Sequence, residues 1–313
     1  MGAAIDVDTS SGSTPGVWLR RSHRVREATA AIVLAAIVLV AILAPVISPY
    51  NPTTPNSNAV LAGPTAAHPF GTDQFGRDML SRVIWGARPT LLTAALSTLL
   101  AVGVGVPLGL LAGSARRWTS GVIMRVMDVL LAFPGILLAL VVVTVLGSGL
   151  LTIVVAVAVS LVPIFARLAY GETSSLVARP FILASRLVGA GEPRVLARHV
   201  LPNLTSQILV SATSMIGWAI LIAASLNFLG FGVQPPTPDW GVDLSNGVGY
   251  VNVAWWAATF PGLAIAITIL AVNYLGDWIA ALLDPRQAAT GSTGVLESGR
   301  RLADTEQLIE RAG

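Results

Sequence analysis

The chain has 313 residues, of which 54% are hydrophobic and 11% charged, and its formal net charge is +3. This composition is typical of an integral membrane protein with several spans, in which surplus arginine marks cytoplasmic loops rather than a nucleic-acid partner. Cysteine and lysine are both absent, which excludes disulfides, a thiolate nucleophile, a Schiff-base lysine and the lysine of a phosphate-binding loop. If the protein uses ATP, another subunit must therefore bind it.

The amino-terminal part predicts a tail followed by one membrane span. Residues 1–19 are polar and have no apolar periodicity, as in a disordered tail. Four arginines then precede an apolar run at 28–46, an arrangement that also resembles a secretory signal peptide. The run is nearly as long as a bilayer is wide, and no small-residue cleavage site precedes Pro45 and Pro49, so we favour an uncleaved first span.

The next region is expected to leave the membrane and then return to it. Residues 48–88 are rich in Pro, Asn, Thr and Gly, so we assign residues 20–89 to the first span and an extracytoplasmic segment. The second span is predicted from Thr90 to Gly113. Every fourth residue along it is small, which lets another helix approach closely: Ala101, Gly105, Gly109 and Gly113. We interpret this stripe as a packing seam, within this chain or with a partner subunit, rather than as a pore lining.

Four further spans are predicted, which gives an all-α membrane protein with six transmembrane helices. Residues 129–166 contain no charged side chain. Because one span needs about 20 residues, they must form two helices joined by a tight turn at Gly147-Ser148-Gly149, with the third span starting near Val122. The remaining segments are the fifth span at 204–228, the sixth at 260–283, a core domain over 90–286 and a cytoplasmic tail at 287–313.

A charged insert separates the fourth and fifth predicted spans. From Arg167 to Arg198 it carries seven ionised groups, and placing them near the membrane centre would cost on the order of 20 kcal/mol. The insert must therefore lie outside the membrane. With the amino terminus inside, 16 of the 19 arginines fall on the cytoplasmic side, so the positive-inside rule places both termini and this insert in the cytoplasm.

The insert itself predicts two short helices around a glycine turn. Residues 181–188 favour one helix, Gly189-Ala190-Gly191 breaks it, and Glu192-Pro193 starts a second. Pro202 is expected to end that second helix and to begin the fifth span. The apolar residues of the second helix share one face, which so short a pair of helices cannot bury alone: Val195, Leu196 and Val200. The insert is therefore either a loop lying on lipid headgroups or a docking element for a partner protein.

Several segments together resemble one family of membrane permeases. The order Ala184-Ser185, Gly189 and His199-Val200-Leu201-Pro202-Asn203 resembles the cytoplasmic EAA loop of ABC importer permeases. Other segments are similar to the peptide/nickel group, and within it to the C-type permease of dipeptide and oligopeptide importers: HPFGTDQFGRDMLSRVIWGAR from His68, NFLGFGVQPPTPDWG from Asn227, FPGLAI from Phe260, and NYLGDW with LLDPR between Asn273 and Arg286. The resemblance covers residues 23–287 and implies the type I (MetI-like) permease fold.

The resemblance implies a role for both ends of the helix bundle. The EAA-like loop would dock on a cytoplasmic ATPase through the residues that match the family's motif: Leu183, Ala184, Ser185, Gly189, His199, Pro202 and Asn203. The opposite face, including the loop at 234–240, would receive a substrate-binding protein. The motif residues on that face are Gly71, Thr72, Asp73, Gly76, Arg77, Asp78, Gly86 and Arg88. The chain departs from the family where Leu183 and Ser185 replace a glutamate and an alanine, and where Ala280-Ala281 replaces an Arg-Asp pair.

The partners that the resemblance implies are a second, B-type permease, two ATP-binding subunits or one fused ATPase, an extracytoplasmic substrate-binding protein, a peptide substrate and membrane lipid. ATP and magnesium would bind to the ATPase subunits. This chain would then be no enzyme, with no catalytic residue, cofactor or metal of its own. The cargo stays open among dipeptides, oligopeptides, glutathione-like peptides, nickel chelates and haem.

Two other functions fit the sequence less well. An intramembrane protease needs a nucleophile with a base, or paired aspartates, at membrane depth, whereas the three histidines all lie in predicted tails or loops. A secondary transporter or channel is expected to show midplane charges or two repeated halves, and no repeat is evident. Of the acidic groups near the spans, Asp128 is predicted to pair with Arg125 one helical turn away, and Asp277 lies near the inner end of the sixth span.

Overall fold

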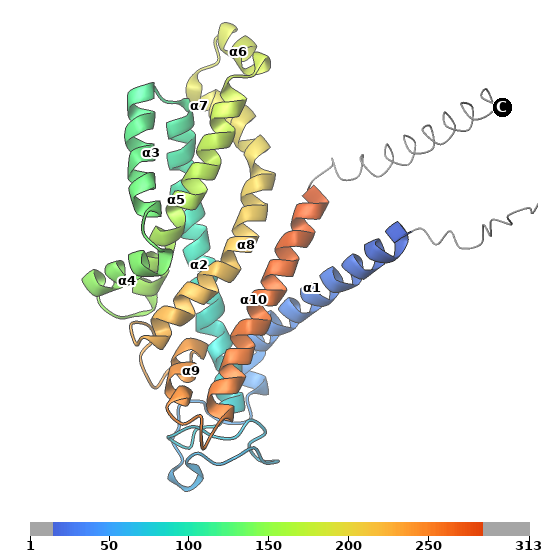
Figure 1. The fold of residues 1–313 in the computed structure, drawn as a ribbon, viewed down its shortest axis with the longest axis vertical. Coiled ribbons are helices and arrows are strands. Elements are labelled where there is room, and N and C mark those ends of the chain that lie inside the picture. Colours follow the sequence, from blue (N-terminus) through green and yellow to red (C-terminus); the bar gives the residue numbers. More distant parts are fainter. Residues whose placement is uncertain (1–14, 284–313) are drawn as a thin grey trace, which may run out of the picture.

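The computed structural model of the protein describes residues 15–283, and within that range all the regular elements are helices (Figure 1). The tail predicted at 287–313 and most of the one predicted at 1–19 lie outside the described residues. Five helices are long and apolar enough to cross a membrane: α1 (Pro15–Ile47), α2 (Met79–Ser114), α5 (Leu150–Val177), α8 (Leu201–Phe228) and α10 (Trp256–Leu283).

A bent pair of helices is the candidate for the sixth crossing. Helices α3 (Arg117–Leu131) and α4 (Gly135–Leu146) are apolar enough together, but they meet at an angle of 95°. The third span predicted from near Val122 corresponds to this bent pair, whose first helix begins at Arg117. The break comes at Pro134, which has no amide hydrogen to continue the helix and disfavours helical geometry in the residue before it. The tight turn expected at residues 147–149 does separate α4 from α5.

The bundle has two dissimilar ends (Figure 1). At one end lie the long segment 48–78, which contains a 3-10 turn at Ser57–Ala59, and the short helix α9 (Trp240–Val248). At the other end lie α6 (Pro180–Leu187) and α7 (Glu192–Val195), which connect α5 to α8. We call α6, α7 and the turn between them the α6–α7 hairpin.

Helix α2 begins at Met79 rather than at Thr90, where the apolar run starts. Asp78 caps it, because the carboxylate accepts a hydrogen bond from the backbone amide of Ser81 at 2.8 Å. The helix therefore includes Arg82, Gly86 and Arg88, which the sequence analysis placed in the extramembrane segment. A charged side chain inside such a helix requires a buried partner, and the structure provides one for each arginine, as described below.

The small-residue stripe of α2 packs against α5 of the same chain. Ala101 is fully buried. A Cβ atom added to Gly105 would lie 2.6 Å from the carbonyl oxygen of Val162, and one added to Gly113 would lie 2.6 Å from the Cβ of Thr173. A Cβ atom added to Gly109 would lie 2.6 Å from the Cβ of Ala169. These spacings leave no room for a methyl group, so the backbones of α2 and α5 are in direct contact along the stripe.

The chain is helical without interruption from Glu192 to Phe228, so Pro202 does not end the second helix of the insert. A π-helical stretch at Leu196–Val200 joins α7 to α8. Pro202 follows this stretch directly, as the second residue of α8, and it has no amide hydrogen with which to continue the preceding hydrogen-bond pattern. The expectation that Pro202 separates the insert from the fifth span is wrong, and the two form one continuous rod.

Candidate functional sites

The α6–α7 hairpin is built around the turn at Gly189. Its φ angle is +90°, a conformation that side chains other than glycine rarely adopt. The turn closes through backbone hydrogen bonds from Gly189 to the carbonyl of Arg186 at 3.0 Å and from Ala190 to that of Ser185 at 3.1 Å. A Cβ on Gly189 would meet nothing within 4 Å, so the backbone angle alone requires glycine here.

An ion pair also spans this turn, and the sequence analysis did not anticipate it. Nε of Arg186 lies 2.9 Å from Oε1 of Glu192, and Nη2 of Arg186 donates a hydrogen bond to Oε2 of Glu192 at 3.1 Å. The pair connects the last turn of α6 to the first turn of α7. The sequence signal for this pair is the presence of opposite charges on the two sides of a glycine turn. The hairpin is held both by the backbone hydrogen bonds of the turn and by this ion pair.

The hairpin buries much of its own apolar surface, contrary to expectation. Val195 and Val200 are fully buried together with Ile182 of α6 and Leu204 of α8. No outside partner is needed for that face, because α5 and α8 cover it. The apolar side chains that do remain exposed lie on α6 and the turn: Phe181, Leu183, Leu187 and Val188.

The structure brings all the residues predicted for coupling to this end of the bundle. Leu183 and Ala184 are exposed on α6, with Ser185 half-buried beside them. The ring of His199 lies edge-on to Phe181, with 6.4 Å between the ring centres. Asn203 donates to the carbonyl of His199 at 2.6 Å, which secures the junction between the π-helical stretch and α8.

The opposite end holds a buried cluster of charged groups, which we call the Asp–Arg cluster and which consists of Asp73, Arg77, Arg82 and Asp243. Arg82 is 1% exposed, and its Nε donates to Oδ1 of Asp243 at 2.9 Å. Arg77 pairs with Asp73 at 2.6 Å, and Arg82 lies 3.8 Å from the same carboxylate. Arg82 therefore ties α2 to α9, two elements far apart in the sequence.

Arg82 also binds the two loops that flank the cluster. It donates to the carbonyl of Pro52 at 2.9 Å and to that of Pro236 at 3.2 Å. Buried charges are stable only when they are paired and hydrogen-bonded, and Arg82 meets both conditions. Neither Arg82 nor its partner Asp243 was among the predicted site residues, since nothing in the sequence links positions 82 and 243.

The remaining motif residues on this face are internal to the structure of segment 48–78 and the start of α2. The side chains of Asp73, Arg77 and Asp78 are almost completely buried, so they shape the surface rather than present themselves on it. Gly76 has a φ angle of +72°, and a Cβ there would overlap the carbonyl of Asn56. Other motif residues pack on tryptophans: Gly71 and Thr72 on Trp256, and Gly86 on Trp240.

Arg88 connects α2 to α1. Its Nε donates to the carbonyl of Ala41 at 2.6 Å and a second nitrogen donates to that of Ile42 at 2.9 Å. Pro45 lies inside α1 and has no amide hydrogen, so it leaves the carbonyl four residues earlier, that of Ala41, without a helical donor. Arg88 replaces the missing donor, which explains how a charged group is accommodated within this helix.

Asp239 caps α9 and lies outside the membrane-spanning segments. It accepts hydrogen bonds from the amides of Gly241 at 2.9 Å and Val242 at 3.3 Å, and from Thr90 at 3.2 Å. Burial nevertheless raises the pKa of Asp239 from 3.8 to about 6, because desolvation outweighs these hydrogen bonds. The folded protein thus holds this proton more tightly than the unfolded chain does.

This shift predicts a pH-dependent stability. The stabilising contribution of protonated Asp239 is complete below about pH 4 and is lost as the pH rises through about 6, up to about 3 kcal/mol in total. Asp239→Asn keeps an acceptor for the cap but does not ionise. In a detergent unfolding assay, wild type should lose this contribution between pH 4 and pH 7, whereas the variant has none to lose. The melting temperature of the variant minus that of wild type should therefore increase over this pH range. A constant difference across this range would contradict the shift.

Two predictions about acidic residues near the membrane have different outcomes. Asp128 pairs with Arg167 of α5 and not with Arg125, so the predicted partner was wrong. Asp277 is exposed on α10. Among the side chains of residues 29–283, no three acidic or histidine groups lie together as a metal site would require. A small hollow of about 230 Å³ lies at the elbow between α3 and α4, lined in part by Phe133, Ser160 and Trp218.

Comparison with known proteins matches almost the whole chain. The family described as binding-protein-dependent transport system inner membrane component matches residues 105–289, and the N-terminal transmembrane domain of oligopeptide transport permease C matches residues 28–64. The di/tripeptide transport system permease protein DppC of Pseudomonas aeruginosa is 40% identical over 275 residues, which cover 86% of this chain and 91% of that protein. The glutathione transport system permease protein GsiD of Escherichia coli is 43% identical, with 86% and 89% covered.

A similar fold is found among solved structures. An inward-facing structure of the MetNI methionine ABC transporter aligns with a TM-score of 0.55 at 19% identity, and the alignment covers 66% of this chain and 98% of the other. At this identity the similarity concerns the fold alone. It agrees with the predicted MetI-like arrangement of helices.

Proposed function

The chain belongs to the family of binding-protein-dependent inner-membrane permeases, and from that premise we propose that it forms one half of a peptide pathway driven by separate ATPase subunits. It is a multi-pass membrane permease subunit of an ABC importer. The observation that carries the coupling part of the proposal is the tip of the α6–α7 hairpin. There Leu187 is 88% exposed and Val188 is 87% exposed, outside any helix long enough to span a membrane.

An exposed apolar patch on an otherwise self-contained element is typical of a protein–protein interface. The inner face of the hairpin is already covered by this chain, so the exposed side chains on α6 and the turn remain available to a partner. Leu183, which stands where the family has a glutamate, is 49% exposed on the same helix. We infer that the ATPase is held here mainly by apolar contacts and not by an ion pair at this position.

The helical rod from Glu192 to Phe228 supports a mechanical role. Because α7 continues into α8 without a loop, a displacement of the hairpin by the ATPase would move α8 directly. The Arg186–Glu192 pair and the Gly189 turn would carry α6, and with it the end of α5, in the same direction. ATP and magnesium would bind in the ATPase subunits, either two chains or one fused chain.

The distribution of arginine supports the orientation of the bundle. With the α6–α7 hairpin in the cytoplasm, the end that carries the Asp–Arg cluster faces outward. That end would receive the substrate-binding protein on a surface shaped by segment 48–78 and α9. The hollow at the α3–α4 elbow would face the second, B-type permease across the pathway, and its lining is mostly apolar, with no ionisable side chain.

The cargo that we propose is a short peptide. Relatives that are about 40% identical are named for di/tripeptide and glutathione transport. The hollow at the elbow offers no charged group to select among such peptides, so we assign the selection to the substrate-binding protein.

Replacing Val188 by aspartate tests the docking surface. An unpaired carboxylate at an apolar interface costs at least about 1.4 kcal/mol, so the ATPase should bind about tenfold or more weakly. Co-purification of the ATPase and uptake of a labelled dipeptide should both fall. Val253→Asp is the matched control, since Val253 is also exposed but lies at the opposite end. Normal ATPase binding by the Val188 variant, or an equal loss of ATPase binding in the two variants, would refute the docking surface.

The energy source is tested separately. Uptake by the complete importer should stop when ATP is withdrawn and continue when only the proton gradient is dissipated. The reverse result would identify a secondary transporter and would overturn the proposed function.

A further inference from the structure

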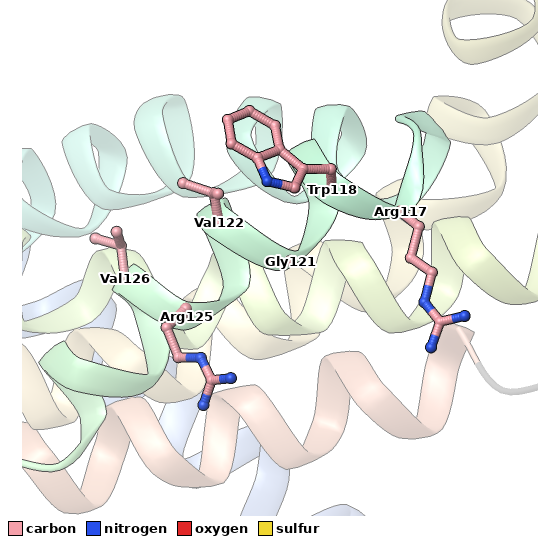
Figure 2. A pocket seen from close by; sticks show the side chains of 6 residues that line it. All are labelled: Arg117, Trp118, Gly121, Val122, Arg125 and Val126. Carbon is pink, nitrogen blue, oxygen red and sulfur yellow. The ribbon is translucent and has the colours of Figure 1, made fainter.

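The outer face of α3 has two rows of side chains of different chemistry. Arg117, Gly121 and Arg125 follow one another at intervals of four residues, so they share one flank of the helix. The second row consists of Trp118, Val122 and Val126. Figure 2 shows the two guanidinium groups on one flank, with Gly121 between them, and the three apolar side chains on the other. The buried side of α3 is formed by Met124 and Met127.

Neither arginine of this face is neutralised by the protein. Both are exposed, and no acidic side chain of residues 29–283 pairs with either of them. The contrast is Arg167, which reaches Asp128 at the next turn of α3. Exposed arginines at the cytoplasmic boundary of a membrane attract anionic lipid headgroups. The flank therefore has two positive charges that call for an anion from outside the described chain.

The shape between the two arginines favours a headgroup. A Cβ on Gly121 would meet nothing within 4 Å, so the absence of a side chain leaves open space over the backbone. The face borders a shallow, open hollow of about 680 Å³, lined by the six residues of the two rows. Arg117 and Arg125 are about 12 Å apart along the helix. Long arginine side chains can bend toward one another over such a distance, so both can reach a phosphate placed above Gly121.

The position along the membrane also agrees with a lipid. Helix α3 follows directly after α2 and begins at the same end of the bundle as the α6–α7 hairpin (Figure 1). Trp118 is 81% exposed close to that end, where tryptophan is enriched at the boundary between headgroups and acyl chains. The apolar row then runs from the boundary toward the hydrocarbon, parallel to an acyl chain.

From these observations we propose that the Arg117–Gly121–Arg125 flank binds the phosphate of an anionic phospholipid, while one acyl chain of the same molecule lies along Trp118, Val122 and Val126. A soluble phosphate would make no use of the apolar row, and a neutral lipid would leave the two guanidinium charges without compensation. The arrangement thus selects a molecule that is anionic at one end and apolar along its length.

Quenching of tryptophan fluorescence by brominated lipids tests the site in the complete importer reconstituted into phosphatidylcholine nanodiscs. The signal of Trp118 is isolated by subtraction of a Trp118→Phe assembly, which is required because the chain has 8 tryptophans. At equal mole fractions, brominated phosphatidylglycerol should associate with Trp118 about tenfold more strongly than brominated phosphatidylcholine. Inorganic phosphate added to the buffer should leave this preference unchanged.

Two variants separate the site from a general attraction of charge. In Arg117→Gln/Arg125→Gln the preference should fall to about one, whereas Arg116→Gln, which removes a neighbouring charge outside the hollow, should retain it. Gly121→Leu keeps both charges and has space for its side chain, yet it should abolish the preference because it fills the headgroup position.

Three results in the nanodiscs without added phosphate would overturn the proposal. They are equal quenching by the two lipids in the wild-type assembly, a preference that survives in Gly121→Leu, and a Trp118 that neither lipid quenches. The last result would mean that another protein subunit covers this face. Loss of the preference on addition of inorganic phosphate would likewise replace the lipid by a soluble anion as the occupant.

Discussion

Replacement of Arg82 by methionine is expected to destabilise the protein by about 3–5 kcal/mol, because it leaves the carboxylate of Asp243 buried without its partner. The loss should be large because Arg82 also supplies donors to the carbonyls of Pro52 and Pro236. The melting temperature of the purified chain in detergent should fall by about ten degrees.

Two further variants show whether the pairing is the cause. Arg194→Met removes an exposed arginine of the α6–α7 hairpin and should change the melting temperature little. Arg82→Met/Asp243→Leu removes both charges and should recover a substantial part of the loss, as pairs replaced by apolar groups often do. If the double variant lost as much stability as Arg82→Met and a separate Asp243→Leu variant together, the buried pair would not be the source of the effect.

Gly189→Asp is expected to reduce peptide uptake about tenfold while the chain still inserts and folds, because a side chain at a positive φ angle costs about 1–2 kcal/mol. The strain would shift the turn that presents Leu187 and Val188, and it would add a charge next to them. ATP hydrolysis by the assembled importer should continue without transport. Uptake of a labelled dipeptide and phosphate release, measured on the same proteoliposomes, give the ratio of the two rates.

Gly191 provides a matched control for this variant. It lies two residues further along the same turn, but its φ angle is −71°, which every residue tolerates, and a Cβ there would approach only Pro193 at 3.9 Å. Gly191→Asp should therefore keep most of the uptake, and Gly189→Ala, which adds no charge, should lose part of it. Equal uptake by Gly189→Asp and wild type would remove the coupling role from this turn.

The sequence predicts the membrane spans well where hydropathy alone determines them. The apolar runs that correspond to α1, α5, α8 and α10 were recognised because each is long enough to cross a bilayer. The glycine turn of the hairpin is recognised for a similar reason, since Gly189-Ala190-Gly191 interrupts a helical pattern. In both cases the signal is local and comes from the backbone or from composition.

The errors concern interactions between distant parts of the chain. Composition assigns Arg82 and Arg88 to an extramembrane segment, because residues 48–88 are polar and rich in proline and glycine. Their partners are Asp243 and the carbonyls of Ala41 and Ile42, which lie far away in the sequence. Asp128 was paired with the nearest arginine for the same reason, although Arg167 is the group that folding brings to it.

The bend at Pro134 shows a different limit of hydropathy. A proline inside an apolar run is compatible with either a kinked span or a broken one, and neither charge nor periodicity separates them. The outcome depends on whether the neighbouring helices leave room for the second half to turn away. Here α4 packs across α5, so the second half leaves the direction of α3 by 95°.

The close contact between α2 and α5 has a consequence for how the importer can open. Two helices whose main chains touch over several turns cannot slide or rotate against each other without steric overlap at Gly105, Gly109 and Gly113. During a transport cycle they must therefore travel as one solid block. The relative motion that admits and releases cargo is then left to the boundaries of this block, where larger side chains separate it from the remaining helices.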